Sequence, residues 1–165
     1  MPAFFRRPAR IDGLTLEVGE RVLATGEATS GTVIATDRRL LVPADEGFHP
    51  IGWESVDRAS WDRDGELLLV VETGPMGSGP RHHRLQVEEP GRLVDVVREQ
   101  VNASMVITRY LPISGERGVR VTGRRRRTQD RLRWVVAVDD GLHLDDPEVR
   151  AKVDAAVAAV RAEVE

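Results

Sequence analysis

Apolar and polar residues alternate in short runs over the first half of the chain, which is the pattern of β-strands with one buried face. Two such runs, at 21–28 and 31–36, flank a turn of small residues. Thr36-Asp37-Arg38-Arg39 then predicts a tight hairpin into a third strand, Leu40-Leu41-Val42. The segment from Gly19 to Trp61 is therefore expected to form the sheet around which the rest of the chain is arranged.

Further strands are predicted after the loop at 43–47. A short strand is expected at 51–53, and a half-buried strand ends at Trp61. The turn signal Asp62-Arg63-Asp64-Gly65 leads into the continuous apolar run 67–71, which predicts a central strand. The glycine- and proline-rich stretch 73–80 is predicted to be a hairpin loop before a strand at 81–87.

Two helices are predicted from apolar residues spaced by three and four positions. The first begins with Pro90 at its first helical position and runs to about Ala103, with a stripe formed by Leu93, Val94, Val97 and Val101. The second follows Asp146 as N-cap and Pro147, and its apolar face comprises Val149, Val153, Val157, Val160 and Val164. Strands at 105–113, 119–122 and 131–138 lie between the two helices.

These elements predict an α+β protein in three parts. Residues 1–18 form an irregular lead-in whose Phe4-Phe5 pair packs on the body, and residues 19–104 form a bent antiparallel sheet capped by a helix. Residues 105–165 add a three-stranded β-meander and a C-terminal helix. No linker-like composition divides the last two parts, which favours one compact unit. Trp53 and Trp61 are expected in the core.

The motifs of the first domain resemble those of bacterial pleckstrin-homology-like and GRAM-type modules. The resemblance covers roughly residues 15–105 and is carried by Gly19-Glu20, Thr36-Asp37-Arg38-Arg39-Leu40 and the pattern Ile51-x-Trp53-x-x-Val56. It implies that a C-terminal helix plugs one open end of a bent sheet. The whole chain also resembles a group of small uncharacterised proteins of GC-rich bacteria.

The lipid-headgroup site of eukaryotic pleckstrin-homology domains does not carry over to this chain. Those domains use basic residues around the loop between their first two strands, whereas residues 26–31 here contain Glu27 and no base. The loop at 43–47 is likewise acidic. Arg38 and Arg39 are therefore predicted to be structural, with one of them capping the turn or pairing with Glu54 or Asp57.

Composition excludes several classes of function. The 165 residues include no cysteine, which rules out disulfides, thiolate zinc sites and cysteine nucleophiles. There is no signal-peptide-like apolar region near Met1 and no run of membrane-spanning length, so a soluble, cytoplasmic protein is expected. No nucleophile elbow or phosphate-binding loop motif occurs, and we expect a non-catalytic protein without a cofactor.

Neither the histidine pair nor the acidic cluster of the sequence predicts a metal site. His82 and His83 are adjacent and therefore point to opposite faces of a strand, so one ion cannot easily take both. Asp139, Asp140, His143, Asp145 and Asp146 lack the order of a calcium loop and are better explained as a turn and a helix cap. No metal ligand is predicted.

Charge is strongly partitioned along the chain, whose formal net charge is −3. Residues 108–134 contain nine arginines against only Glu116 and Asp130, while the segments on either side are acidic. The candidate contacts for an anion or a partner are the arginines of this hairpin: Arg117, Arg120, Arg124, Arg125, Arg126, Arg127, Arg131 and Arg133. A solvated hairpin tip is the alternative without function.

The sequence is interpreted as a non-catalytic binding or scaffold module that binds a protein or peptide. A sheet edge or the groove beside the helix at 91–103 would provide the contact. The alternative is association with an anionic surface, either a lipid membrane or a nucleic acid, through the 117–133 hairpin together with Arg6, Arg7 and Arg10. An exposed edge strand would also permit a homodimer.

Overall fold

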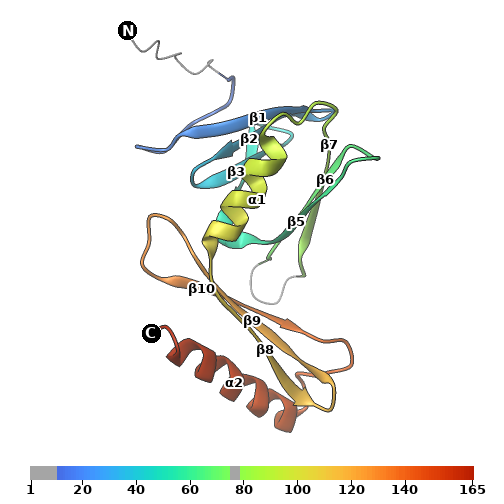
Figure 1. Cartoon of the computed structure of the whole chain (residues 1–165), viewed down its shortest axis with the longest axis vertical. Coiled ribbons are helices and arrows are strands. Elements are labelled where there is room, and N and C mark those ends of the chain that lie inside the picture. Colours follow the sequence, from blue (N-terminus) through green and yellow to red (C-terminus); the bar gives the residue numbers. More distant parts are fainter. Residues whose placement is uncertain (1–10, 75–78) are drawn as a thin grey trace. The chain divides into compact units, whose positions relative to one another are not determined.

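The structure is a computed structural model that describes residues 11–74 and 79–165 (Figure 1). The described residues form three antiparallel sheets and two α-helices, which confirms the predicted mixed α+β class. The chain divides into two compact units, residues 1–102 and residues 103–165, and each is described by itself. The expected packing of Phe4-Phe5 and the loop residues 75–78 lie outside the described residues.

The first sheet contains the segment around which the sequence is organised. Its strands lie in the order β1-β2-β3-β4, which are Val22–Ala28, Gly31–Thr36, Arg39–Pro43 and Phe48–Gly52. Antiparallel pairing of Ile34 with Leu41 and of Leu40 with Ile51 confirms the predicted hairpin at 36–39.

The fourth strand begins earlier than predicted. It includes His49 and Pro50 and ends at Gly52, whereas Trp53 belongs to a 3₁₀ turn, η1, at Trp53–Ser55. Proline lacks an N–H group and is tolerated at the edge of a sheet. Because β4 is an edge strand of its sheet, Pro50 can pair with Leu41 without breaking the ladder.

The second sheet follows η1 and has the order β5-β6-β7, which are Val56–Asp62, Leu67–Glu72 and Arg81–Gln86. The continuous apolar run forms the central strand β6, as predicted. The Asp62 carboxylate accepts hydrogen bonds from the amides of Asp64 and Gly65, at 3.1 and 3.2 Å, and so closes the predicted turn.

The first helix, α1, spans Leu93–Ser104 and starts three residues later than Pro90. Gly91 has a φ of +52°, in the left-handed region, so a right-handed helix cannot run through it. Residues 90–92 instead form a turn in which the Leu93 amide donates to the Pro90 carbonyl at 2.8 Å. The prediction of Pro90 as the first helical residue is therefore wrong.

One hydrophobic core joins both sheets and α1 in the first unit. It contains side chains of β2, β3, β4, β6 and β7 together with Leu93, Val96, Val97 and Val101 of the helix. Gly26 of β1 allows close approach of the helix, since a Cβ at that position would lie 2.8 Å from a methyl group of Leu93. Trp53 is 4% exposed and Trp61 packs against the same core, as predicted.

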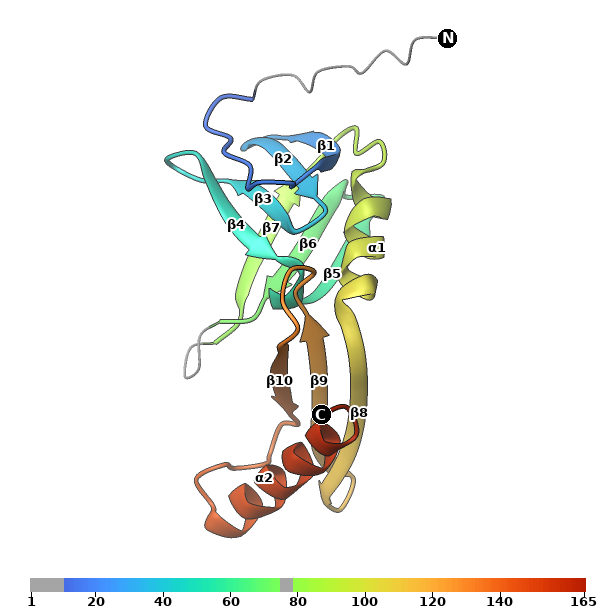
Figure 2. The same ribbon diagram turned by 90° about the vertical axis from the view of Figure 1, so that its left-hand side faces the viewer.

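The second unit is a β-meander covered by a helix. Its strands are β8 (Met105–Ser114), β9 (Arg117–Arg125) and β10 (Leu132–Val138), in the order β10-β9-β8, and its helix α2 spans Pro147–Ala162 (Figure 2). The Asp146 carboxylate accepts a hydrogen bond from the Glu148 amide at 2.9 Å, which confirms the predicted N-cap.

Helix α2 packs on one face of this sheet. Val153 and Val160 are buried against Ile107, Val119 and Val121, with Val149 and Val157 packed beside them. Val164 lies beyond the end of the helix and is 40% exposed, so its assignment to the buried face was wrong. An ion pair of 2.9 Å between Arg109 and Glu163 also joins β8 to the end of the helix region.

The β2–β3 turn is held by the buried carboxylate of Glu20, whose side chain is fully buried. It accepts hydrogen bonds from the Thr36 hydroxyl at 2.6 Å, from Arg39 Nε at 2.8 Å and from the Glu17 amide at 2.8 Å. Burial alone would raise the pKa of Glu20, but the hydrogen bonds from Arg39, Thr36 and Glu17 outweigh it and lower this pKa to about 2.

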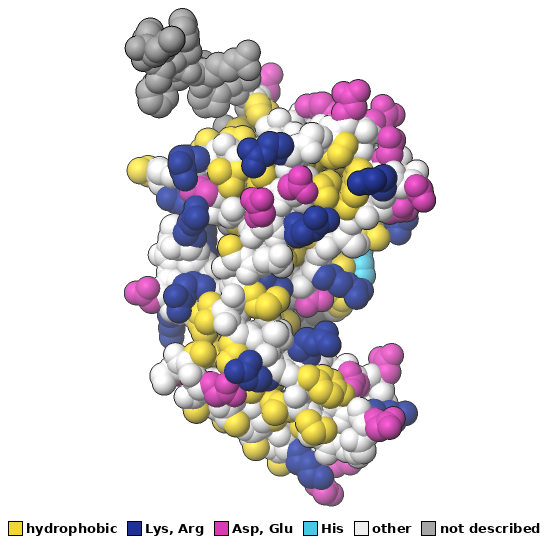
Figure 3. Space-filling model, viewed as in Figure 1, with side chains coloured by type: hydrophobic (Ala, Val, Ile, Leu, Met, Phe, Trp, Pro, Cys, Tyr) yellow, Lys and Arg dark blue, Asp and Glu magenta, His cyan; other side chains and the backbone are white. Residues whose placement is uncertain are grey.

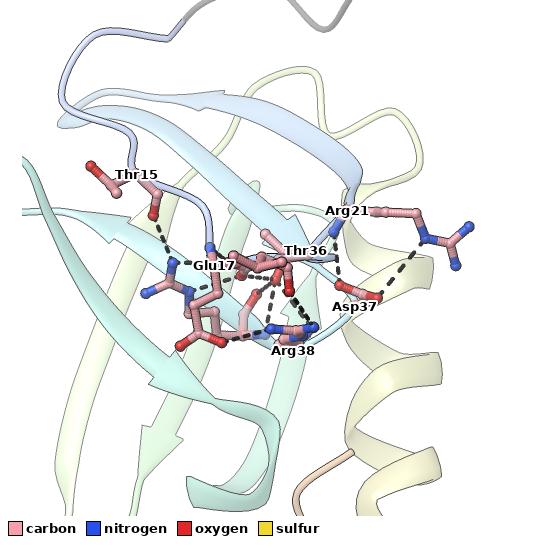
Figure 4. A network of polar contacts seen from close by, with 9 residues as sticks. Thr15, Glu17, Arg21, Thr36, Asp37 and Arg38 are labelled. Carbon is pink, nitrogen blue, oxygen red and sulfur yellow. Dashed lines mark hydrogen bonds and ion pairs between the residues drawn. The ribbon is translucent and has the colours of Figure 1, made fainter. Parts of the chain in front are cut away.

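The other residues of the turn also bind the segment that precedes β1 (Figure 4). Arg38 pairs with Glu17 at 2.9 Å, and the Asp37 carboxylate accepts the Arg21 amide at 2.9 Å. Arg38 and Arg39 are therefore structural, as predicted, but their acidic partners are Glu17 and Glu20 rather than Glu54 or Asp57.

We predict that Glu20→Gln lowers the free energy of unfolding by about 3 kcal/mol, because it leaves the Arg39 guanidinium without its buried partner. Urea unfolding followed by circular dichroism measures this change. Glu88→Gln removes one exposed carboxylate and is the matched control, with an expected effect within about 0.5 kcal/mol. Equal effects of the two substitutions would contradict a special role of Glu20.

The low pKa of Glu20 also predicts how stability depends on pH. A carboxyl group whose pKa is lower in the folded state stabilises the fold above its unfolded pKa of 4.5, and this contribution disappears as the pH falls to about 2. The expected loss is about 3 kcal/mol between these two pH values. Glu20→Gln should abolish that part of the acid sensitivity, and an unchanged pH profile in this variant would refute the assignment.

Candidate functional site

The arginine-rich hairpin predicted from the sequence is formed by β9, β10 and the turn between them. Register places the eight candidate residues as follows: Arg117, Arg120, Arg124 and Arg125 on β9, Arg126 and Arg127 in the turn, and Arg131 and Arg133 at the start of β10 and on it. They lie along the whole length of β9, so they do not all meet at one loop.

Two of the eight arginines do not belong to the exposed group at the turn of the hairpin. Arg117 lies at the opposite end of β9, about 25 Å along the strand from Arg125, and its guanidinium packs against Gly141. Arg124 is only 4% exposed, and it donates a hydrogen bond of 2.8 Å to the Ser104 hydroxyl. Arg124 therefore belongs to the packing of the second unit.

Three exposed arginines lie at the turn end of the hairpin, while the exposed Arg117 and Arg120 lie further along β9. Arg125, Arg131 and Arg133 are exposed, and none of them forms an ion pair with another residue in the described part of the chain. Arg125 lies opposite Leu132 in the ladder, and Arg133 lies opposite Arg124. We call Arg125, Arg131 and Arg133 the arginine tip.

The aromatic residue nearest the arginine tip in sequence is partly buried. Trp134 packs against the core of the second unit, and the guanidinium of Arg161 lies 5.7 Å from the centre of its ring. The ring is therefore occupied by a cation of its own unit. It is not available to stack on a base or another flat ligand.

A second polar arrangement lies near Arg120. The Tyr110 hydroxyl donates a short hydrogen bond to the Asp139 carboxylate, which also accepts the Gly118 amide at 2.8 Å. The bond to Asp139 raises the pKa of Tyr110, and the bonds from Tyr110 and Gly118 lower the pKa of Asp139. Asp139 thus closes the end of the meander, and Asp146 caps α2, in agreement with the predicted turn and cap.

Basic and acidic side chains are interspersed on the face of the molecule shown in Figure 3. On that face, dark blue and magenta groups alternate rather than forming one broad basic surface. A surface that tracks a nucleic-acid backbone usually carries a continuous basic stripe, which this face does not show.

The first unit contains a cluster that sequence analysis missed, formed by His49, Glu72 and His83. The Nε2 atoms of His49 and His83 lie 2.9 and 2.8 Å from the same oxygen of Glu72, Oε2. The two rings are stacked, with centres 5.4 Å apart and planes inclined by 22°. All three side chains are partly buried, with exposed fractions of 30%, 16% and 11% for His49, Glu72 and His83.

Strand register explains why these three side chains meet. Glu72 pairs with Arg81 and Val70 pairs with His83, so Glu72 and His83 are diagonal neighbours on the face of β6 and β7 that also carries the buried Leu68. His49 lies opposite the core residue Val42 in the other sheet. His82 is on the opposite face of β7 and exposed, as the alternation predicted.

The two histidines favour the ionised form of Glu72. Burial would raise the pKa of Glu72, but the hydrogen bonds and electrostatic attraction of His83 and His49 lower it below its usual value. The cluster therefore combines one carboxylate with two imidazole nitrogens, which is a set of atoms able to bind a metal ion.

No family model, curated protein or solved structure matches this chain. In the described ranges, neither helix has both the length and the apolarity needed to cross a lipid bilayer.

We predict that Arg124 and Arg133 differ sharply in their effect on stability although they face each other in the ladder. Arg124→Ala removes a buried guanidinium and leaves the Ser104 hydroxyl without this donor, which should lower the free energy of unfolding by about 2 kcal/mol. Arg133→Ala, at an exposed position, should stay within about 0.5 kcal/mol. Chemical denaturation followed by circular dichroism tests this, and equal losses would contradict the placement of Arg124.

Proposed function

We propose that the protein is a non-catalytic binding module whose arginine tip binds an acidic segment of a protein partner. The observation that carries this proposal is the exposure of Arg125, Arg131 and Arg133 at one end of a hairpin, without an ion pair in the described part of the chain. Guanidinium groups bind carboxylates with two parallel hydrogen bonds, so exposed arginines on both faces of one hairpin end suit a flexible glutamate- or aspartate-rich segment.

An acidic protein segment fits the tip better than a nucleic acid does. Binding of single strands uses exposed aromatic rings for base stacking. Trp134 is partly buried and its ring carries the guanidinium of Arg161, and residues 125–133 contain no aromatic residue. The chain also has a net charge of −3, and a polyanion as large as a nucleic acid would be repelled by the rest of its surface.

A lipid membrane is likewise a poorer fit. Peripheral binding combines basic residues with apolar side chains that insert below the headgroups. The turn at 126–131 is composed of arginine, threonine, glutamine and aspartate, so it offers no apolar group for insertion. The absence of cysteine supports a reducing compartment, the cytoplasm, as the place where the partner is met.

For the first unit we propose a pleckstrin-homology-like scaffold. Two antiparallel sheets, followed by a helix that shares their core, agree with the order of elements in such modules. The Thr36–Arg39 turn of the resembling motif is held by Glu20 and Glu17, which supports a structural role for this motif. Binding is assigned to the second unit for this reason.

The sheet of the second unit also offers edges to a peptide or to a second copy of the chain. β8 and β10 are its edge strands, and Met105, Val106 and Tyr110 of β8 are exposed. Pairing at such an edge would extend the contact made by the arginine tip.

A fluorescently labelled glutamate-rich peptide tests the proposal by fluorescence anisotropy at low and at physiological salt. We predict saturable binding that weakens with salt and becomes about 10-fold weaker in the triple variant R125S/R131S/R133S. Three exposed ion pairs at about 0.5 kcal/mol each account for this loss.

The matched control is R58S/R63S/R84S, which removes the same charge from exposed positions of the first unit and should retain the affinity of the wild type. Equal weakening in both variants would show that net charge, and not the tip, determines binding. Tighter binding of a single-stranded oligonucleotide or of anionic vesicles than of the peptide would overturn the assignment of a protein partner.

A further inference from the structure

We propose that His49, Glu72 and His83 form a binding site for a divalent transition-metal ion, with Zn²⁺ as the ion to test. Two imidazole nitrogens and one carboxylate oxygen are ligands that zinc accepts, and three protein ligands leave a fourth position for water or another ligand. The three ligand atoms all lie within 4.8 Å of one another.

The separations in the cluster are close to those that a tetrahedral ion requires. An ion bound at about 2.0–2.1 Å from each ligand places the ligand atoms about 3.3 Å apart. The Nε2 atoms of His49 and His83 are now 2.9 and 2.8 Å from Glu72 Oε2. Side-chain rotation would have to lengthen these two distances by about half an ångström and bring the two Nε2 atoms, which lie within 4.8 Å of each other, to the same spacing.

The backbone places the ligands without help from flexible segments. Glu72 ends β6, His83 lies within β7 on the same face, and His49 lies within β4 of the other sheet. Ligands on strands hold their geometry better than ligands on loops. An ion at this position would link the two sheets of the first unit.

Zinc binds an imidazole through an unprotonated nitrogen. The ion can therefore replace the hydrogen bonds to Glu72 when Nε2 of each ring carries no proton and Nδ1 holds the remaining one. The carboxylate is already ionised. Partial exposure of all three side chains leaves a path for a hydrated ion from solvent.

Two of the few histidines of the chain meet at this one carboxylate. The chain has four histidines, and the site uses two of them, taken from different sheets and separated by 34 positions in sequence. A buried carboxylate that only needed hydrogen-bond donors could be satisfied by nearby backbone amides. Here it instead meets two side chains that are themselves zinc ligands.

The test is a zinc titration of the untagged protein at neutral pH, in competition with a chromogenic chelator and with metal content measured after dialysis. We expect one Zn²⁺ per chain with micromolar or tighter affinity, and a zinc-dependent rise in the midpoint of thermal unfolding. His83→Ala and Glu72→Gln should each weaken binding at least about 100-fold, since loss of even an outer-shell partner costs about 10- to 100-fold.

The matched control is His82→Ala combined with His143→Ala, which removes the other two histidines of the chain and should leave both stoichiometry and affinity unchanged. Circular dichroism checks that every variant is folded, and Glu72→Gln keeps the size and an acceptor oxygen of the native side chain. Less than one equivalent of bound zinc in the wild type, or equal affinity in Glu72→Gln and the control, would overturn the proposal.

Discussion

The fold of the first unit depends on one buried charge, the carboxylate of Glu20. It is held by Thr36 and Arg39 of the β2–β3 turn, and it connects that turn to the segment before β1. The indole of Trp53 then donates to the Thr36 carbonyl at 2.9 Å, which fixes the turn to the core. Burial of a carboxylate is unfavourable unless hydrogen-bond donors satisfy its oxygen atoms. Glu20 can therefore be buried only together with its donors Thr36 and Arg39. Arg38 and Arg39 of the turn already form ion pairs with Glu17 and Glu20, so they are not free to bind a ligand.

This constraint separates the structural part of the molecule from the parts proposed to bind. The arginine tip belongs to the second unit and is not neutralised by an acidic partner in the described ranges, in contrast to Arg38 and Arg39, which are. The histidine–glutamate cluster belongs to the first unit but uses β4, β6 and β7, away from the turn that Glu20 holds. A partner at the tip and an ion at the cluster would therefore use different residues, and each proposal stands on its own observations.

Local sequence signals predicted the parts of the fold that local interactions determine. Short apolar runs and the turn signals between them identified β1, β2, β3, β6 and β7, and the Asp146-Pro147 pair identified the start of α2, because caps and strand faces depend on neighbouring residues. The start of α1 was missed because the φ angle of Gly91 cannot be read from its identity. Sequence spacing also did not predict that Arg124 is buried or that His49, Glu72 and His83 meet. Their environment depends on which strands pair, and a signal for the cluster would have required the register of two sheets.

The central claim is that binding belongs to the arginine tip and not to the motif that resembles a pleckstrin-homology module. Amide chemical-shift mapping of the whole ¹⁵N-labelled chain, titrated with a glutamate-rich peptide, tests this claim most directly. If the arginine tip binds the peptide, we expect saturable shifts of the amides of residues 125–133 and unchanged shifts for the amides of residues 19–61. Shifts concentrated on the Thr36–Arg39 turn, with residues 125–133 unaffected, would contradict it.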